Sequence, residues 1–138
     1  MDTNNNYYEW KKGESVELSP HFNSREFSCK CTHPDCIDQK ASVDLIDKLT
    51  RMREAIGHAL TINSGFRCIV HQKEILEKGL PACTRLSQHE LGEAADVYYH
   101  DMSLLLSEAK KEFKALGIAK SFIHMDLRDD RLRIWYYR

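Results

Sequence analysis

A ten-residue stretch in the second half of the chain constrains the fold more than any other feature. It runs from Ser87 to Asp96 and reads Ser-Gln-His-Glu-Leu-Gly-Glu-Ala-Ala-Asp. His89 and Asp96 stand on either side of Gly92, and a turn at this glycine would fold both side chains back onto one point. Further along the chain, His124 supplies a second imidazole. Two imidazoles and a carboxylate suit a catalytic zinc ion, which takes three protein ligands and keeps one position open.

The length and composition indicate one ordinary globular domain. The chain has 138 residues, of which 42% are hydrophobic and 30% are charged, and its net charge is −1. A charge this close to zero gives no strong field that would favour nucleic acid or an anionic membrane. No apolar stretch is long enough to span a bilayer. We expect neither nucleic acid nor membrane as a partner, and we take the chain to be a monomer.

The beginning of the chain is polar. Residues 1–17 show no clear periodicity, and we expect them to form an N-terminal arm, with residues 18–138 as the domain that holds the site. Tyr7, Tyr8 and Trp10 would pack over that domain, the alternative being a partly ordered terminus. The segment has no apolar core of the kind found in secretory signals. We therefore expect a protein made in the cytoplasm that leaves, if at all, by another route.

The spacing of apolar residues predicts several helices and strands. The strongest helix begins after Ser42, a favourable N-cap, has Asp44 in its first turn and ends at Gly57. Its apolar residues recur at steps of three and four, namely Leu45, Ile46, Leu49, Met52 and Ile56. Further helices are expected at 70–78 and 103–116, strands at 60–64, 94–99, 121–127 and 131–137, and loops at 19–36 and 79–85. A turn at Asp129-Asp130 would join the last two strands.

The strand expected at 121–127 places two polar groups on one face. Alternation points Phe122, His124 and Asp126 one way. The other face carries the apolar side chains Ile123, Met125 and Leu127. A polar pair that faces away from a core points either to bulk water or to a functional site. The pair therefore favours His124 as a residue of such a site.

Five cysteines are present, at positions 29, 31, 36, 68 and 83. An odd number argues against a fold built only on disulfides. Cys29, Cys31 and Cys36 are close in sequence and could hold a structural metal with Cys68 as fourth ligand. The alternatives are reduced thiols packed in a small cluster, or disulfides formed after release.

Arg67 follows the strand expected at 60–64. Its planar guanidinium could pair with the carboxylate of a ligand. The residue alone, however, favours an ordinary surface ion pair.

The pattern Ser87-x-His89-x2-Gly92-x-Ala94-x-Asp96, followed by His124-x-Asp126, resembles the signature of zinc peptidases that cut peptidoglycan stem peptides. These are the D-alanyl-D-alanine carboxypeptidases and L-alanyl-D-glutamate endopeptidases, which include many phage endolysins. Residues 64–68 with His71, and residues 27–31, resemble other segments of the same family. The resemblance covers roughly residues 18–137 and implies that residues 18–138 are a zinc peptidase domain.

The resemblance also implies a fold and a set of roles. The fold is α+β, a small single domain with helices packed on an antiparallel sheet, like that of hedgehog and D-Ala-D-Ala peptidases. His89, Asp96 and His124 would bind the zinc ion. Arg67 would be catalytic or substrate-binding, through a substrate carboxylate or the scissile carbonyl. Ser87 and Gln88 would line the substrate groove.

The general base is where this sequence departs from better-studied members. Several of those place a carboxylate shortly before the last histidine, whereas residues 117–121 contain none. Asp126 is the nearest alternative, because it shares a strand face with His124. We expect it to act as the catalytic base, the other reading being a residue that orients a ligand imidazole. Glu90 and Glu93 are more distant candidates.

Three functions follow as hypotheses. The first is a phage or prophage lysin that hydrolyses stem peptides and reaches the cell wall after release through a holin-type pore or another non-Sec route. The second is a non-catalytic zinc-binding domain of the same fold, used as a phage structural or binding module. The third is a small domain in which the cysteine cluster binds metal for structure alone. The sequence does not choose between carboxypeptidase and endopeptidase cleavage.

Overall fold

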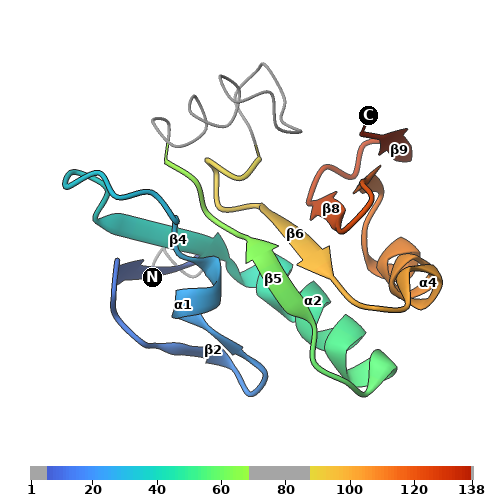
Figure 1. The fold of residues 1–138 in the computed structure, drawn as a ribbon, viewed down its shortest axis with the longest axis horizontal. Coiled ribbons are helices and arrows are strands. Elements are labelled where there is room, and N and C mark those ends of the chain that lie inside the picture. The colour runs from blue at the N-terminus through green and yellow to red at the C-terminus, as the bar shows by residue number, and fades with distance from the viewer. Residues whose placement is uncertain (1–5, 69–87, 138) are drawn as a thin grey trace.

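The computed structural model describes residues 6–68 and 88–137 (Figure 1). The helix expected at 70–78, the loop at 79–85 and Ser87 lie outside the described residues. The elements are, in order, β1 Tyr7–Lys11, β2 Glu17–Ser19, β3 Phe22–Asn23, α1 Ser24–Phe27, β4 Asp38–Ser42, α2 Val43–Ile56, β5 Thr61–Ser64, β6 Ala94–Tyr98, α4 Met102–Glu112, β7 Ala115–Ile118, β8 Ile123–Asp126 and β9 Arg133–Tyr136. The mixture of helices and strands confirms a small α+β domain.

The largest sheet has five strands in the order β5-β6-β8-β7-β9. Every pair in it is antiparallel except β7 and β9, which run parallel. The expected turn residues Asp129 and Asp130 do lie between β8 and β9, but the two strands do not pair with each other as a hairpin. Since β6 and β7 already occupy both edges of β8, the last strand cannot pair with β8, and it pairs with the other edge of β7.

The helix expected at 103–116 ends earlier, at Glu112. The sequence predicts Ser103 as its N-cap, but Asp101 caps it instead, and the Asp101 side chain accepts a hydrogen bond from the backbone N–H of Leu104 at 3.1 Å. Phe113 and Leu116 are buried as expected, but Leu116 belongs to β7. Apolar spacing alone did not separate the end of a helix from the start of a buried strand.

Helix α2 agrees with the sequence-based prediction. The Ser42 hydroxyl accepts a hydrogen bond from the Leu45 N–H at 3.4 Å, and Gly57 ends the helix at φ +79°. The five predicted apolar residues are all buried. They share one core with Leu105 and Ala109 of α4, and the two helices contact each other.

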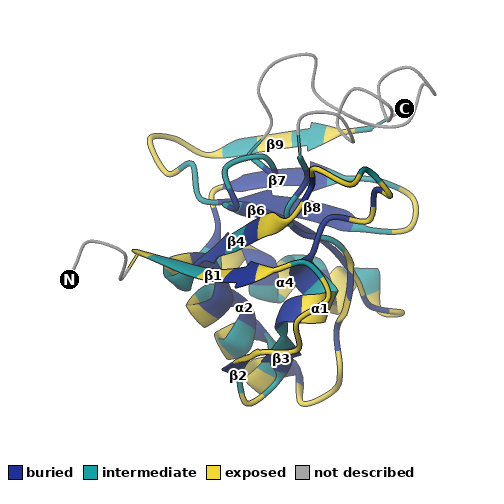
Figure 2. Ribbon diagram, turned by 90° about the vertical axis from the view of Figure 1, so that its left-hand side faces the viewer, coloured by how far each residue is buried: buried dark blue, intermediate teal, exposed yellow. Residues whose placement is uncertain are grey.

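Strand alternation separates the core from the opposite face of the sheet. Ala95, Leu116 and Met125 form one row across β6, β8 and β7, and all three lie in the core. The next row contains Asp96, His124 and Gly117 and faces the other way. Figure 2 shows the buried residues concentrated on these central strands and on the inner sides of the helices.

The N-terminal residues pack on the rest of the domain. β1 pairs with β4 in antiparallel fashion, from Tyr7 opposite Ser42 to Lys11 opposite Asp38. Trp10 belongs to the core, and its indole N–H donates to the Ser28 hydroxyl at 2.7 Å. The segment expected as loop at 19–36, with one short turn at 24–27, contains the short helix α1 at that turn, and also β3 and the last residue of β2. Among the described residues, the helices are too short or too polar to cross a membrane.

Candidate metal centre

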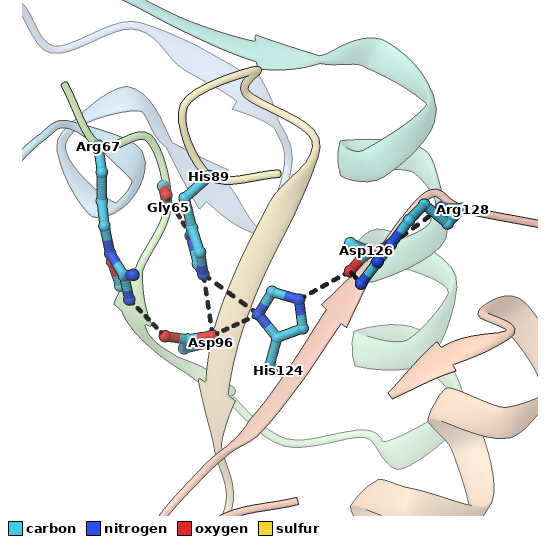
Figure 3. Close-up of polar contacts among 8 residues, drawn as sticks. Gly65, Arg67, His89, Asp96, His124, Asp126 and Arg128 are labelled. Atoms are coloured by element: carbon cyan, nitrogen blue, oxygen red, sulfur yellow. Dashed lines mark hydrogen bonds and ion pairs between the residues drawn. The ribbon is translucent and has the colours of Figure 1, made fainter. Parts of the chain in front are cut away.

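Three donor atoms, one each from His89, Asp96 and His124, meet on the face of the sheet that points away from the core (Figure 3). We call this face the site face. His89 Nε2 lies 3.1 Å from Asp96 Oδ1 and 3.2 Å from His124 Nδ1, and His124 Nδ1 lies 3.0 Å from Asp96 Oδ1. Asp96 and His124 stand directly opposite each other on β6 and β8. All three side chains are buried. The structure thus brings together the three residues that the sequence predicted as ligands.

A tight turn delivers His89 to this point. The carbonyl of Gln88 accepts hydrogen bonds from the backbone N–H groups of Leu91 and Glu93, at 3.1 and 3.0 Å. Gly92 adopts φ +71°, and a Cβ added there would lie 2.9 Å from the carbonyl oxygen of Lys40. Glycine is therefore required both by the backbone conformation and by the close approach of β4.

The geometry of the three donors fits a zinc ion. Nitrogen and oxygen ligands held about 2.0–2.1 Å from a tetrahedral zinc ion lie roughly 3.3 Å apart, close to the separations found here. His89 Nδ1 donates to the carbonyl of Gly65 at 2.7 Å, and His124 Nε2 donates to Asp126 Oδ2 at 2.8 Å. These bonds leave the lone pairs of the neutral imidazoles directed at the Asp96 carboxylate. Three lone-pair donors in mutual contact need a positive charge among them, either a bound metal ion or a proton on one imidazole.

The electrostatics of the centre favour ligands in their metal-binding protonation states. Burial lowers the pKa of His89, which keeps the imidazole neutral. Burial alone would raise the pKa of Asp96, but the neighbouring His89 and His124 hold it far below its usual range. Burial would likewise lower the pKa of His124, but hydrogen bonds with Asp126 and Asp96 outweigh this effect and raise it. The metal-free centre therefore keeps Asp96 ionised and favours a proton on His124 that zinc would displace.

Arg67 lies behind Asp96 rather than on the surface. Its Nη2 donates to Asp96 Oδ2 at 2.8 Å, and its Nε donates to the Ser64 hydroxyl at 2.9 Å. The side chain is only 8% exposed, so the pair is buried, and the surface ion pair favoured by the residue alone is wrong. Arg67 also lines a pocket of about 440 Å³ together with Phe66 and Glu90. The guanidinium therefore contacts the centre, while the residue also lines a pocket that does not include the three ligands.

Asp126 contacts the outer side of the His124 ring, away from the three converging donors (Figure 3). Its carboxylate also accepts from Arg128, at 3.0 Å to Oδ1 from Nε and 2.8 Å to Oδ2 from Nη2. Burial opposes ionisation, but the bonds with His124 and Arg128 lower the pKa of Asp126 to about 2. A fully buried carboxylate with both oxygens occupied is placed to orient His124. These contacts favour the orienting role over the expected role as base.

The site face extends to residues that the sequence did not single out. Gly117 stands between His124 on β8 and Trp135 on β9. The indole ring of Trp135 occupies the space over Gly117, where a Cβ would come within 2.5 Å of its nitrogen, and lies 5.5 Å from the His124 ring. Burial raises the pKa of Tyr137, and the charge of Asp96 adds to this rise. Only the strand register reveals these neighbours, because they come from separate parts of the sequence.

Three further candidates from the sequence are Gln88, Glu90 and Glu93. Glu93 accepts a hydrogen bond from the Tyr7 hydroxyl, which raises the pKa of Tyr7 to about 12. Glu90 is half-buried and lines the same pocket as Arg67. Gln88 is half-buried at the start of the His89 turn.

A second group of possible metal ligands is formed by residues other than His89, Asp96 and His124. Cys29, Cys31, Cys36 and Cys68 have their sulfur atoms within 4.8 Å of one another. None of these four is in a disulfide.

A comparison with known protein families agrees with the arrangement of the first centre. A family model described as Peptidase M15 matches residues 20–126, which include His89, Asp96 and His124. A search of curated proteins found no match. Because the matched range covers most of the chain, the protein belongs to the M15 family of zinc peptidases, of the D-alanyl-D-alanine carboxypeptidase type.

Proposed function

We propose that this protein hydrolyses a peptide bond in the stem peptides of bacterial peptidoglycan, as a phage or prophage lysin released by a holin-type or other non-Sec route. The observation that carries the proposal is the convergence of His89 Nε2, Asp96 Oδ1 and His124 Nδ1 within 3.2 Å of one another in a chain of a zinc peptidase family. The resemblance of the residues around this centre to stem-peptide hydrolases supports the substrate. We take the active protein to be a monomer of the hedgehog/D-Ala-D-Ala-peptidase-like fold.

The side chains around the centre have distinct roles in this proposal. His89, Asp96 and His124 hold the zinc ion, which supplies a Lewis acid that polarises the scissile carbonyl and activates water. Arg67 holds the second oxygen of Asp96, and from the edge of its pocket it binds a carboxylate of the stem peptide or the carbonyl under attack. The family resemblance also assigns Ser87 and Gln88, which precede His89 in the sequence, to the substrate groove.

Proton transfer needs a group other than the expected one. Asp126 is enclosed by His124 and Arg128, so we assign it to positioning the His124 ring. Among the carboxylates considered from the sequence, Glu90 borders the pocket of Arg67. We therefore propose Glu90 as the group that accepts a proton from water and passes it to the leaving amine.

The test is digestion of purified peptidoglycan by the zinc-loaded protein, with a chelated sample as control and mass spectrometry of the fragments. Release of free D-alanine would assign a carboxypeptidase. A new N-terminal D-glutamate, or its amidated form, would assign an endopeptidase. Intact peptidoglycan after incubation with fully zinc-loaded protein would contradict the proposal.

One observation favours a second candidate, a non-catalytic zinc-binding module of the same fold in a phage structural or binding role. Residues 117–121 contain no carboxylate, and Asp126 is engaged with Arg128. This candidate predicts tight binding to peptidoglycan without cleavage. Any turnover that is lost on chelation would exclude it.

A further inference from the structure

The four cysteines of the second group have the separations of a metal-bound cluster rather than those of disulfides. Cys68 Sγ lies 3.8 Å from Cys29 Sγ and 3.6 Å from Cys31 Sγ. A disulfide would require sulfur atoms about 2.05 Å apart. Four sulfur atoms at about 2.3 Å from a tetrahedral zinc ion lie roughly 3.8 Å from one another. These two separations match the tetrahedral arrangement, and the other sulfur pairs of the cluster lie within 4.8 Å.

The surroundings of the cluster are suited to thiolates. Lys12 Nζ lies 3.3 Å from Cys31 Sγ, and Gln39 Nε2 lies 3.4 Å from Cys36 Sγ. The backbone N–H of Cys68 donates to Cys29 Sγ at 3.4 Å. N–H groups that point at sulfur stabilise its negative charge, and Lys12 offsets the excess charge of four thiolates around one divalent cation.

Gln39 also fixes the shape of the cluster. It is 2% exposed, and its Oε1 accepts from the backbone N–H of Cys29 at 2.6 Å while its Nε2 faces Cys36. One buried amide on β4 therefore contacts both ends of the loop at residues 28–37, which carries Cys29, Cys31 and Cys36. Three of the cysteines are themselves buried, and Cys68 is half-buried.

We propose that Cys29, Cys31, Cys36 and Cys68 bind a second zinc ion, with all four coordination positions filled by protein. With no open position, this ion has a structural role. It joins the single loop between α1 and β4 to Cys68, the residue that follows Arg67. The backbone N–H of Phe66 also donates to the carbonyl of Phe27 at 2.8 Å. The ion therefore stabilises a contact between these two segments that the backbone already makes. The Arg67 segment is thereby held against the N-terminal part of the domain.

The first measurement is the zinc content of the chain and of two sets of variants, by elemental mass spectrometry. The wild-type protein is expected to hold two zinc ions, and the His89→Ala/His124→Ala double variant is expected to hold one. Cys36→Ser should lose one ion. Cys83→Ser, a matched thiol change outside the described residues, should lose none. This count does not depend on peptidase activity, so an inactive protein with a filled cysteine site would refute only the proposed function.

Cobalt substitution identifies the ligands directly. The double histidine variant loaded with Co²⁺ should show the intense thiolate-to-cobalt charge-transfer band of a tetrahedral sulfur site, and Cys36→Ser should lose that band. If Cys36→Ser does not fold, titration of the intact double variant with a mercurial should release one zinc ion per four thiols. A double variant without zinc and without the band would overturn the proposal, as would disulfides among these cysteines or loss of the band in Cys83→Ser.

Discussion

Asp126 accepts a hydrogen bond from His124 Nε2 at 2.8 Å, and this contact directs Nδ1 of the same ring toward Asp96. The two residues are neighbours on one face of β8, so the strand itself sets the pair. Arg128 holds the carboxylate from the other side. A carboxylate that orients a ligand imidazole fixes its tautomer and increases its basicity toward the metal. The role of Asp126 can therefore be separated from that of a proton acceptor by experiment.

Replacing Asp126 with asparagine should weaken zinc binding about 10- to 100-fold, because the ring of His124 loses its charged partner. At saturating zinc, kcat is expected to stay within a few-fold of wild type. Zinc affinity would be measured by competition with a chromophoric chelator, and kcat on a stem-peptide substrate. Asp129→Asn, the same change at an exposed residue, is the control. A general base would instead lose about 10²- to 10⁴-fold in kcat with zinc fully bound.

Replacing Arg67 with alanine should destabilise the metal-free protein by about 3 kcal/mol, because the buried Asp96 carboxylate then loses its guanidinium partner at Oδ2 and keeps only the imidazoles at Oδ1. Bound zinc compensates that charge, so the loss should be smaller in the zinc-loaded protein. Urea unfolding with zinc and with chelator measures both values. Arg51→Ala, which removes an exposed ion pair with Glu112, should cost less than about 1 kcal/mol in either condition. Equal losses for Arg67→Ala with and without zinc would contradict the placement of Arg67 behind a metal ligand.

Adding a methyl group at Gly117 should displace Trp135, because the new Cβ would lie 2.5 Å from the indole nitrogen. We expect Gly117→Ala to cost about 1–3 kcal/mol of stability, the usual range for overpacking. In a Trp135→Ala background the same change should cost much less. A double-mutant cycle by urea unfolding gives the coupling energy. Additive losses would show that the two residues do not meet.

The hydrogen bond from Tyr7 to Glu93 should give the protein a stability dependence at alkaline pH. The pKa of Tyr7 is raised from 10.0 to about 12, so the bond contributes fully below pH 10 and is lost as the pH rises through 12. Because Tyr7 is half-exposed, the contribution should stay below about 1 kcal/mol. The difference in tyrosinate absorbance between wild type and Tyr7→Phe would show this titration directly. A normal titration near pH 10 would mean that the bond does not form in solution.

The features that depend on nearby residues were the ones that the sequence predicted. The capped helix α2 follows from Ser42, Gly57 and a regular apolar spacing. The turn between His89 and Asp96 follows from Gly92, and the facing of His124 and Asp126 follows from strand alternation. Each of these depends on residues within about one element of each other, where backbone geometry alone decides the outcome.

The features that the sequence did not predict depend on pairing between distant segments. β1 and β4 were not expected as strands, because neither shows a clear alternation and each is stabilised by the other. The position of Arg67 behind Asp96 depends on the pairing of β5 with β6. The contact of Trp135 with His124 depends on the parallel addition of β9 to β7. Strand order and register set these contacts, and the sequence did not predict β7 as a strand because Leu116 was assigned to a helix.

The most direct test of the account is the paired measurement of zinc content and stem-peptide cleavage in wild type and His89→Ala, both with an intact cysteine cluster. The His89→Ala variant should lose one zinc ion and its lytic activity together, and the wild-type protein should lose its activity on chelation. Full zinc content and full cleavage in His89→Ala would contradict the central claim that His89, Asp96 and His124 form the catalytic metal centre.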